Sequence, residues 1–237
     1  PVTQAAGELL KGYSAEVTTP DRKSLDVAAG MMPKKAPVYI ASLPKDTSDG
    51  QLAVACHLRD LDLRPVPHIV ARNIEDRQSL EAMVKAFAVK AGVNRALILG
   101  GDRAVPAGEY DSALQLIKSG VLEDNGIDKI AIGCYPEGHP NISDDVLRRA
   151  LFEKLEAADK GGFDVRLISQ LCFSGSAISA YVKSLRDAGV TAKIRIGLAG
   201  PASTRILLKY AAICGVGPSL RLLRKQQSMA KGLMQNN

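Results

Sequence analysis

Residues 135–140, Tyr-Pro-Glu-Gly-His-Pro, place an aromatic ring, a carboxylate and an imidazole within one short segment. They follow the apolar run 130–134, which is typical of a buried parallel strand. The two prolines restrict the backbone and reduce the entropy lost when the segment becomes ordered. The segment therefore predicts a polar site at the end of a strand. A proline-rich loop around one buried histidine is the alternative interpretation.

Three further residues with useful chemistry lie in or after other apolar runs. Glu16 lies inside the first run, where a carboxylate is costly unless it is paired, and where burial would raise its pKa and suit it to general-acid chemistry. His68 lies within the third run, and Asp102 follows two glycines at the end of the fourth. Such glycines allow a flat ligand to approach closely. The alternatives are an edge strand with Glu16 facing water, a core histidine and a plain glycine turn.

Gln170 and Tyr210 extend this set toward the C-terminus. Gln170 ends the sixth apolar run, and its amide offers both a donor and an acceptor, which suits the edge of a heterocycle. Tyr210 lies in a helical pattern after the seventh run. Its ring could stack on an aromatic ligand, although tyrosines in such helices commonly belong to the core or the surface.

The elements that must position these residues recur about every 30 residues, the spacing of a strand-helix unit. Helical spacing of apolar residues predicts helices around 80–88 and 178–185, ended by Gly92 and Gly189, and Ser143 with two aspartates opens another helix. The predicted strands are Tyr13–Thr18, Val38–Ser42, Pro65–Ala71, Ala96–Leu99, Lys129–Tyr135, Val165–Phe173 and Lys193–Ala199.

Strict alternation of strands and helices predicts a parallel sheet, either a closed barrel or an open doubly wound sheet. Polar residues at nearly every strand end favour the barrel, which collects its site from all strands. We therefore expect residues 1–237 to form one α/β domain, a (β/α)8 TIM barrel whose eighth strand is missing from this chain. A seven-stranded open barrel is the alternative.

Composition excludes several classes of protein. The chain has 237 residues, 46% of them hydrophobic, and no apolar run long enough to span a membrane. Its four cysteines form no CxxC pair, so we expect reduced thiols in a cytoplasmic protein rather than a zinc site. The net charge of +6 comes without interleaved aromatic residues, so we expect anionic small molecules and no nucleic acid as ligands. A homo-oligomer is compatible with this composition.

Taken together, the segments resemble the methylenetetrahydrofolate reductase family. The resemblance runs from about residue 13 to about residue 217, and its most specific parts are residues 135–140, the strand 168–173 and Gly-Gly-Asp at 100–102. It implies a (β/α)8 barrel that binds FAD at the C-terminal ends of its strands. It also implies reduction of 5,10-methylenetetrahydrofolate to 5-methyltetrahydrofolate by NADH or NADPH, a step of one-carbon metabolism and methionine biosynthesis.

The resemblance also implies roles for single residues. Glu16 matches the general acid, Asp102 matches the aspartate that bonds the pterin and tunes the flavin, and Gln170 and Tyr210 match folate contacts. The positions that correspond to flavin contacts, at or near the family's own, are Ser42, His68, Gly101, Asp102, Tyr110, Tyr135, His139 and Lys154.

The chain also departs from the family pattern. Gly100 stands where the family usually has arginine, and Val17-Thr18-Thr19 stands where it has Phe-Phe-Pro. The helix after His139 has Leu147, Ala150 and Glu153 near positions where the family has polar residues that reach the flavin. Fewer cationic and polar contacts to a pyrophosphate predict weaker flavin binding. Direct hydride transfer from the nicotinamide, without flavin, is therefore one alternative.

Two other classes of function fit the same residues. One is a folate-binding barrel without reductase activity that works beside a methyltransferase or demethylase. The other is a phosphate-handling lyase or isomerase, for which residues 197–201 could begin a phosphate-binding loop.

Overall fold

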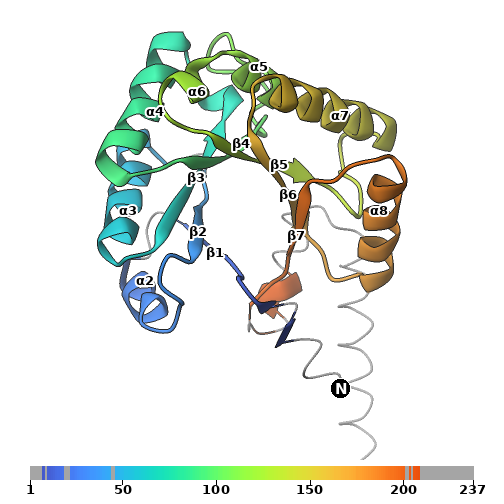
Figure 1. Ribbon diagram of the computed structural model, residues 1–237, viewed down its shortest axis with the longest axis horizontal. Helices are drawn as coiled ribbons and strands as arrows, with labels where there is room; N and C mark the ends of the chain where they lie inside the picture. The colour runs from blue at the N-terminus through green and yellow to red at the C-terminus, as the bar shows by residue number, and fades with distance from the viewer. Residues whose placement is uncertain are drawn as a thin grey trace, which may run out of the picture. The chain divides into compact units, whose positions relative to one another are not determined.

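The computed structural model describes residues 7–8, 10–18, 22–43, 46–200, 203 and 205–208. Strands and helices alternate through this part of the chain (Figure 1). In chain order they are β1 (Ala15–Val17), α2 (Arg22–Ala29), β2 (Pro37–Ile40), α3 (Ser48–Asp60), β3 (Arg64–Val70), the 3-10 helix η1 (Ala71–Asn73), α4 (Arg77–Ala91), β4 (Arg95–Leu99), α5 (Ala113–Lys118), α6 (Val121–Asp124), β5 (Lys129–Cys134), α7 (Asp144–Lys160), β6 (Asp164–Leu171), α8 (Gly175–Asp187) and β7 (Lys193–Gly197).

The strands within the described residues follow one another in sequence order, from β1 to β7. The pairs β1–β2, β2–β3, β3–β4 and β6–β7 are parallel. Sequential order is that of a (β/α)8 barrel, whereas a doubly wound sheet reverses its order at a switch point. The fold is therefore α/β of the barrel type, as the sequence predicts, and an eighth strand is not among the described residues. No helix in this described part is both long and apolar enough to cross a bilayer.

The chain divides into two compact units, and each is described by itself. Within the described residues, unit 1 comprises those up to residue 131 together with 157–164, and unit 2 comprises 132–156 together with those from residue 165 onward. Unit 1 holds β1 to β4, and unit 2 holds β7 and most of β6.

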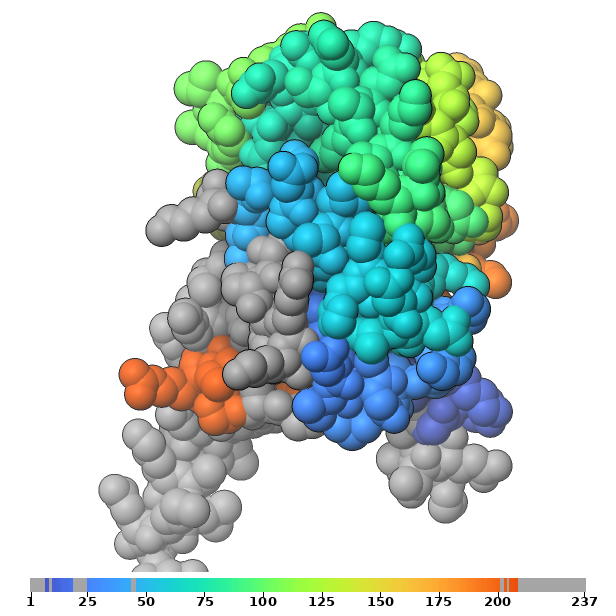
Figure 2. Space-filling model, turned by 90° about the vertical axis from the view of Figure 1, so that its left-hand side faces the viewer, coloured from blue at the N-terminus to red at the C-terminus, as the bar shows by residue number. Residues whose placement is uncertain are grey.

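In unit 1 the helices cover one face of the strands. Helix α3 contacts β2, β3 and α4, and the blue to green residues of α2, α3 and α4 form one continuous surface (Figure 2). Side chains alternate between the two faces of a strand, so Val38 and Ile40 share one face of β2 and Tyr39 takes the other. Val38 and Ile40 are completely buried, as are Ile69 and Ile98 on the neighbouring strands. We call the strand face opposite the helices the inner face.

Helix ends follow the local sequence signals. Helix α4 begins after Asp76, whose side chain accepts a hydrogen bond from the Ser79 backbone, and it ends at Gly92 in the left-handed conformation with φ 63°. Helix α7 begins at Asp144, and Gly189 follows α8 with φ 83°. These ends confirm the predicted helix boundaries. Strand β1 is shorter than predicted at both ends, and β6 ends at Leu171, two residues earlier than predicted.

One buried side chain joins the ends of β2 and β3. The amide nitrogen of Gln51, on α3, donates to the carbonyl oxygens of Ile40 and His68, at 3.0 Å each. Gln51 is 3% exposed, so both hydrogen bonds lie in a buried environment. This bridge fixes the backbone of β3 at His68, one of the residues that the sequence identifies as a site candidate.

Replacing Gln51 by leucine should therefore destabilise the fold. Gln51→Leu keeps the approximate size of the side chain but removes two buried hydrogen bonds, which should lower the free energy of unfolding by about 2–4 kcal/mol. Urea unfolding measures the change. The matched control is Gln78→Leu on the exposed side of α4, which should change stability by less than about 0.5 kcal/mol. Equal stability of the two variants would show that the Gln51 bridge does not support the strand ends.

Candidate functional site

Strand register brings Glu16, Tyr39 and His68 to the inner face of unit 1. Glu16 pairs with Tyr39 across β1 and β2, and Tyr39 pairs with Val66 across β2 and β3. Partners in register project to the same face, and His68 lies two residues after Val66, so it shares that face as well. The position of a carboxylate beside an imidazole therefore follows from strand pairing.

The Glu16–His68 pair is the strongest acid-base contact on this face. Nε2 of His68 lies 3.7 Å from Oε2 of Glu16, which is beyond a normal hydrogen bond but within reach of an ion pair. His68 is 8% exposed, and its Nε2 forms no hydrogen bond within the described part of the chain. The Tyr39 ring meets the imidazole edge to face, with the ring centres 6.3 Å apart.

The surrounding protein shifts the pKa of both groups. Removal from water lowers the pKa of His68 to about 4, because a buried imidazolium loses its hydration, so the imidazole is neutral near pH 7. The surrounding protein atoms also raise the pKa of Glu16, although 60% of its side chain remains exposed. A carboxyl group that holds its proton longer than usual, next to a neutral imidazole and in contact with water, can act as a general acid.

The loop after β4 places Gly101 and Asp102 at the end of the neighbouring strand. Gly101 has φ 102°, and a Cβ atom there would lie 2.4 Å from Cγ1 of Val70, so this position tolerates no side chain. Asp102 is exposed, and Ser42 is half-buried after β2. Tyr110 lies later in the same loop but is 7% exposed, and its burial, with Glu109 nearby, raises the pKa of its hydroxyl.

In unit 2 the segment 135–140 forms a compact turn. The Gly138 backbone donates to the Tyr135 carbonyl at 3.1 Å, and the rings of Tyr135 and His139 meet edge to face with their centres 5.4 Å apart. The Cys172 thiol, at the end of β6, donates to a carboxylate oxygen of Glu137 at 2.9 Å. The structure thus brings together two of the residues that the sequence identifies, and it ties their loop to the adjacent strand end.

Lys154, on α7, lies beside the last residue of β5, directly before this turn. It is close to Cys134 and Tyr181, on the side of β5 that faces α7 and α8. Burial lowers the pKa of the Lys154 amine, with Cys134 opposing that change, and burial raises the pKa of the Cys134 thiol to about 12. This cluster packs helices against the strand. The cofactor contact that the sequence predicts at Lys154 stays a prediction, and in the structure this lysine lies beside Cys134.

Gln170 lies in an irregular part of β6, where the register against β7 shifts between Ile168 and Leu171. Its side-chain oxygen accepts from the Leu171 backbone at 2.8 Å, so its amide nitrogen is the group that it can offer to a ligand. The Ser169 hydroxyl donates to the Gln170 carbonyl and accepts from the Gly197 backbone, which holds the strand end in place. Tyr210 lies outside the described residues.

Sequence reasoning missed several residues that shape these sites. Tyr39 carries the signal of alternation, because it lies between two apolar residues of β2 that face the helices. For Gln51, the sequence shows only a polar residue on the apolar side of a predicted helix, which is a weak indication of a structural role. Nothing in the local sequence indicates the contacts of Arg72 and Cys172, because their partners lie more than 25 residues away.

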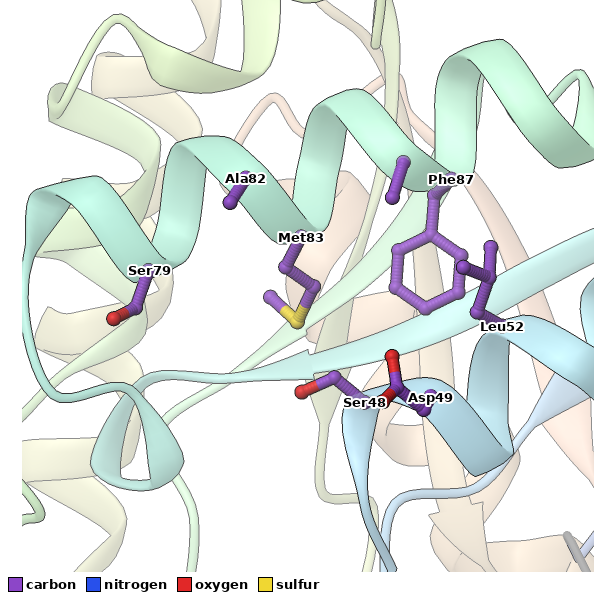
Figure 3. Close-up of a pocket in the computed structure, with 8 residues that line it drawn as sticks. Ser48, Asp49, Leu52, Ser79, Ala82, Met83 and Phe87 are labelled. Carbon is purple, nitrogen blue, oxygen red and sulfur yellow. The ribbon is translucent and has the colours of Figure 1, made fainter.

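The close-up in Figure 3 shows a groove between α3 and α4, on the outer surface of unit 1. Ser79, Met83 and Phe87 lie on its α4 side, and Ser48 and Asp49 lie on its α3 side (Figure 3). It contains none of the residues that the sequence identifies. With Asp49 as its one ionisable lining residue, it offers no acid-base pair.

Comparison with known proteins shows distant structural similarity. No protein-family model matches the sequence. A crystal structure of a variant of the citrate synthase SbnG aligns with a TM-score of 0.43 and 12% identity, over 98% of this chain and 100% of that chain. Phosphoribosyl anthranilate isomerase from Thermotoga maritima aligns with a TM-score of 0.41 and 9% identity, over 86% of this chain and 84% of that chain. Similarity at this level carries no argument about activity, and the fold assignment rests on the strand order.

The neutral, buried His68 predicts a specific acid sensitivity. In the unfolded chain this histidine takes up a proton near its ordinary pKa of 6.5, but in the folded chain only near 4, so falling pH favours the unfolded state between these values. Across this pH range the free energy of unfolding should fall by about 3 kcal/mol. His68→Gln should remove that loss, as measured by urea unfolding between pH 7 and 4. His57→Gln, on the outer helix α3, should leave the loss in place, and an unchanged slope in His68→Gln would contradict a buried neutral imidazole.

Proposed function

We propose that this chain reduces 5,10-methylenetetrahydrofolate to 5-methyltetrahydrofolate, with NADH or NADPH as the source of the hydride. The observation that carries the proposal is the pairing of Glu16 with the buried, neutral His68 at 3.7 Å on the inner face of unit 1. The family resemblance of residues 100–102, 135–140 and 168–173 supports the choice of a folate substrate.

The reaction needs one proton and one hydride. Its raised pKa favours the protonated form of Glu16, which in this proposal passes its proton to a ring nitrogen of the folate as the bond from that nitrogen to the methylene carbon breaks. The resulting iminium carbon accepts the hydride, and oxidised nicotinamide leaves. Because 60% of the Glu16 side chain is exposed, water can return the proton after each turnover.

The protonation state of His68 affects the pKa of Glu16. A protonated imidazole at 3.7 Å would stabilise the carboxylate and lower the pKa of Glu16, which would weaken it as an acid. Burial keeps the imidazole neutral near pH 7, so it does not oppose the raised pKa of Glu16. Asp102, also in unit 1, is proposed to accept hydrogen bonds from the pterin.

The residues present fit a flavin poorly. A flavin pyrophosphate requires cationic donors, whereas Lys154 lies among helix-facing residues beside Cys134. Tyr110 is buried, and the side chain of Arg72 donates to backbone carbonyls of the loop after β4. We therefore derive no step through flavin, and direct transfer from the nicotinamide to the iminium carbon is the form of the reaction that these residues favour.

Replacing Glu16 by glutamine should abolish most of the activity. Glu16→Gln keeps the size of the side chain but removes the transferable proton, so kcat should fall by about 10²–10⁴-fold. Oxidation of NADH or NADPH with 5,10-methylenetetrahydrofolate, with and without added FAD, measures the change. In the wild-type chain kcat should decrease as pH rises through the raised pKa of Glu16, because the protonated carboxyl is the active form.

The control for this substitution is Glu81→Gln, on the exposed side of α4, which should leave kcat unchanged. Near-normal turnover by Glu16→Gln would exclude Glu16 as the acid. Tight binding of tetrahydrofolate with no nicotinamide oxidation by the wild-type chain would instead identify a folate-binding protein without reductase activity. Turnover that requires FAD would overturn direct hydride transfer but leave the acid role of Glu16 intact.

A further inference from the structure

The loop after β4 is held by one residue of the neighbouring strand end. Arg72, in η1, donates from Nε to the Asp111 carbonyl at 3.0 Å, and from one terminal nitrogen to the carbonyls of Arg103 at 2.7 Å and Ala104 at 3.2 Å. Its backbone N–H donates to the Gly100 carbonyl at 3.0 Å, and its carbonyl accepts from Ala107 at 2.9 Å. A single residue thus makes five hydrogen bonds to the loop 100–111.

These anchors bracket Asp102. The carbonyls of Gly100 and Arg103, on either side of it, are both held by Arg72. Gly101 lies between the anchors and packs directly against Val70, with φ 102° and no room for a Cβ atom. The backbone at Asp102 is therefore constrained from both sides, while the residue itself is exposed. Such a constraint reduces the conformational freedom that a ligand would otherwise have to remove on binding.

The rest of the loop is also fixed to unit 1. The Glu109 backbone donates to the Glu75 carbonyl at 3.2 Å, and a Cβ atom on Gly108 would overlap the Glu75 backbone. At its far end, the Gln115 side chain accepts from the backbones of Asp111 and Ser112, which closes the start of α5. The two ends of the loop are thus held by other contacts. Between them, the Arg72 side chain holds the segment that follows Asp102.

We propose that Arg72 is a positioning residue that orients Asp102 toward the ligand by anchoring the loop after β4. The inference rests on the proposed function for the identity of the ligand, but not for the anchoring itself. Arginine suits this task because its planar guanidinium donates in several fixed directions at once, whereas the single ammonium of lysine does not.

The first test measures the anchoring directly. In Arg72→Lys, amide hydrogen exchange of residues 101–111 should accelerate by roughly tenfold or more, because local opening no longer breaks the guanidinium bonds. The control is Arg186→Lys, whose guanidinium also donates to backbone carbonyls, including Ala192 at 3.0 Å, but in unit 2 before β7. That variant should accelerate exchange only near its own loop. Unchanged exchange at 101–111 in both Arg72→Lys and Arg72→Ala would overturn the proposal.

The second test asks whether Arg72 acts through Asp102. Arg72→Lys should raise KM for the folate by roughly tenfold while kcat changes less, because the lost contact orients the bound ligand rather than the proton donor. The same substitution in an Asp102→Asn background should have little further effect on KM, since residues that act together are not additive. Additive effects would overturn the link to Asp102.

The failures of the two proposals are distinguishable. If the wild-type chain neither binds tetrahydrofolate nor oxidises the nicotinamide, the proposed function fails, while hydrogen exchange still decides whether Arg72 anchors the loop. If the wild-type chain turns over and both Arg72 variants match it in exchange and in KM, the proposed function stands and the positioning role fails.

Discussion

The register of β1, β2 and β3 is the constraint on which the candidate site in unit 1 depends. Because side chains alternate along a strand, the pairing of Glu16 with Tyr39, and of Tyr39 with Val66, puts one carboxylate and one imidazole on the same face. A slip of one residue would turn Glu16 into the apolar layer beneath the helices and bring Val17 to the inner face. The completely buried Ile40 and Val38 make such a slip costly.

Polar side chains donate hydrogen bonds to backbone carbonyls where several strands end. Gln51 donates to carbonyls of β2 and β3, and Arg72 donates to carbonyls of the loop after β4. Ser169 donates to a carbonyl of β6 and accepts from the backbone of β7. In each unit such carbonyls lie at the carboxyl ends of the strands, where barrel folds place their sites. Side-chain donors at these points make the edge rigid, so ligand-binding groups can be exposed without a mobile backbone.

The charge state of the Glu16–His68 pair depends on the burial of His68. A neutral imidazole costs less to bury than an imidazolium, so His68 remains uncharged, and Glu16 gains no ion-pair stabilisation of its carboxylate near pH 7. The same physics acts on Lys154 and Cys134 in unit 2, where burial disfavours both the ammonium and the thiolate. Burial thus favours the uncharged forms of His68, Lys154 and Cys134 alike.

The sequence by itself determined the alternation of strands and helices, the helix ends at Gly92 and Asp144, and the placement of Glu16 within the first strand. These features depend on interactions between residues only a few positions apart, so a short segment of sequence is enough to predict them. Only the tertiary structure decided that Glu16 meets His68, that Lys154 joins Cys134, and that Arg72 reaches the loop around Asp102. Those contacts join residues about 20 to 50 positions apart in the chain, and strand register and helix packing, rather than local pattern, set which distant side chains meet.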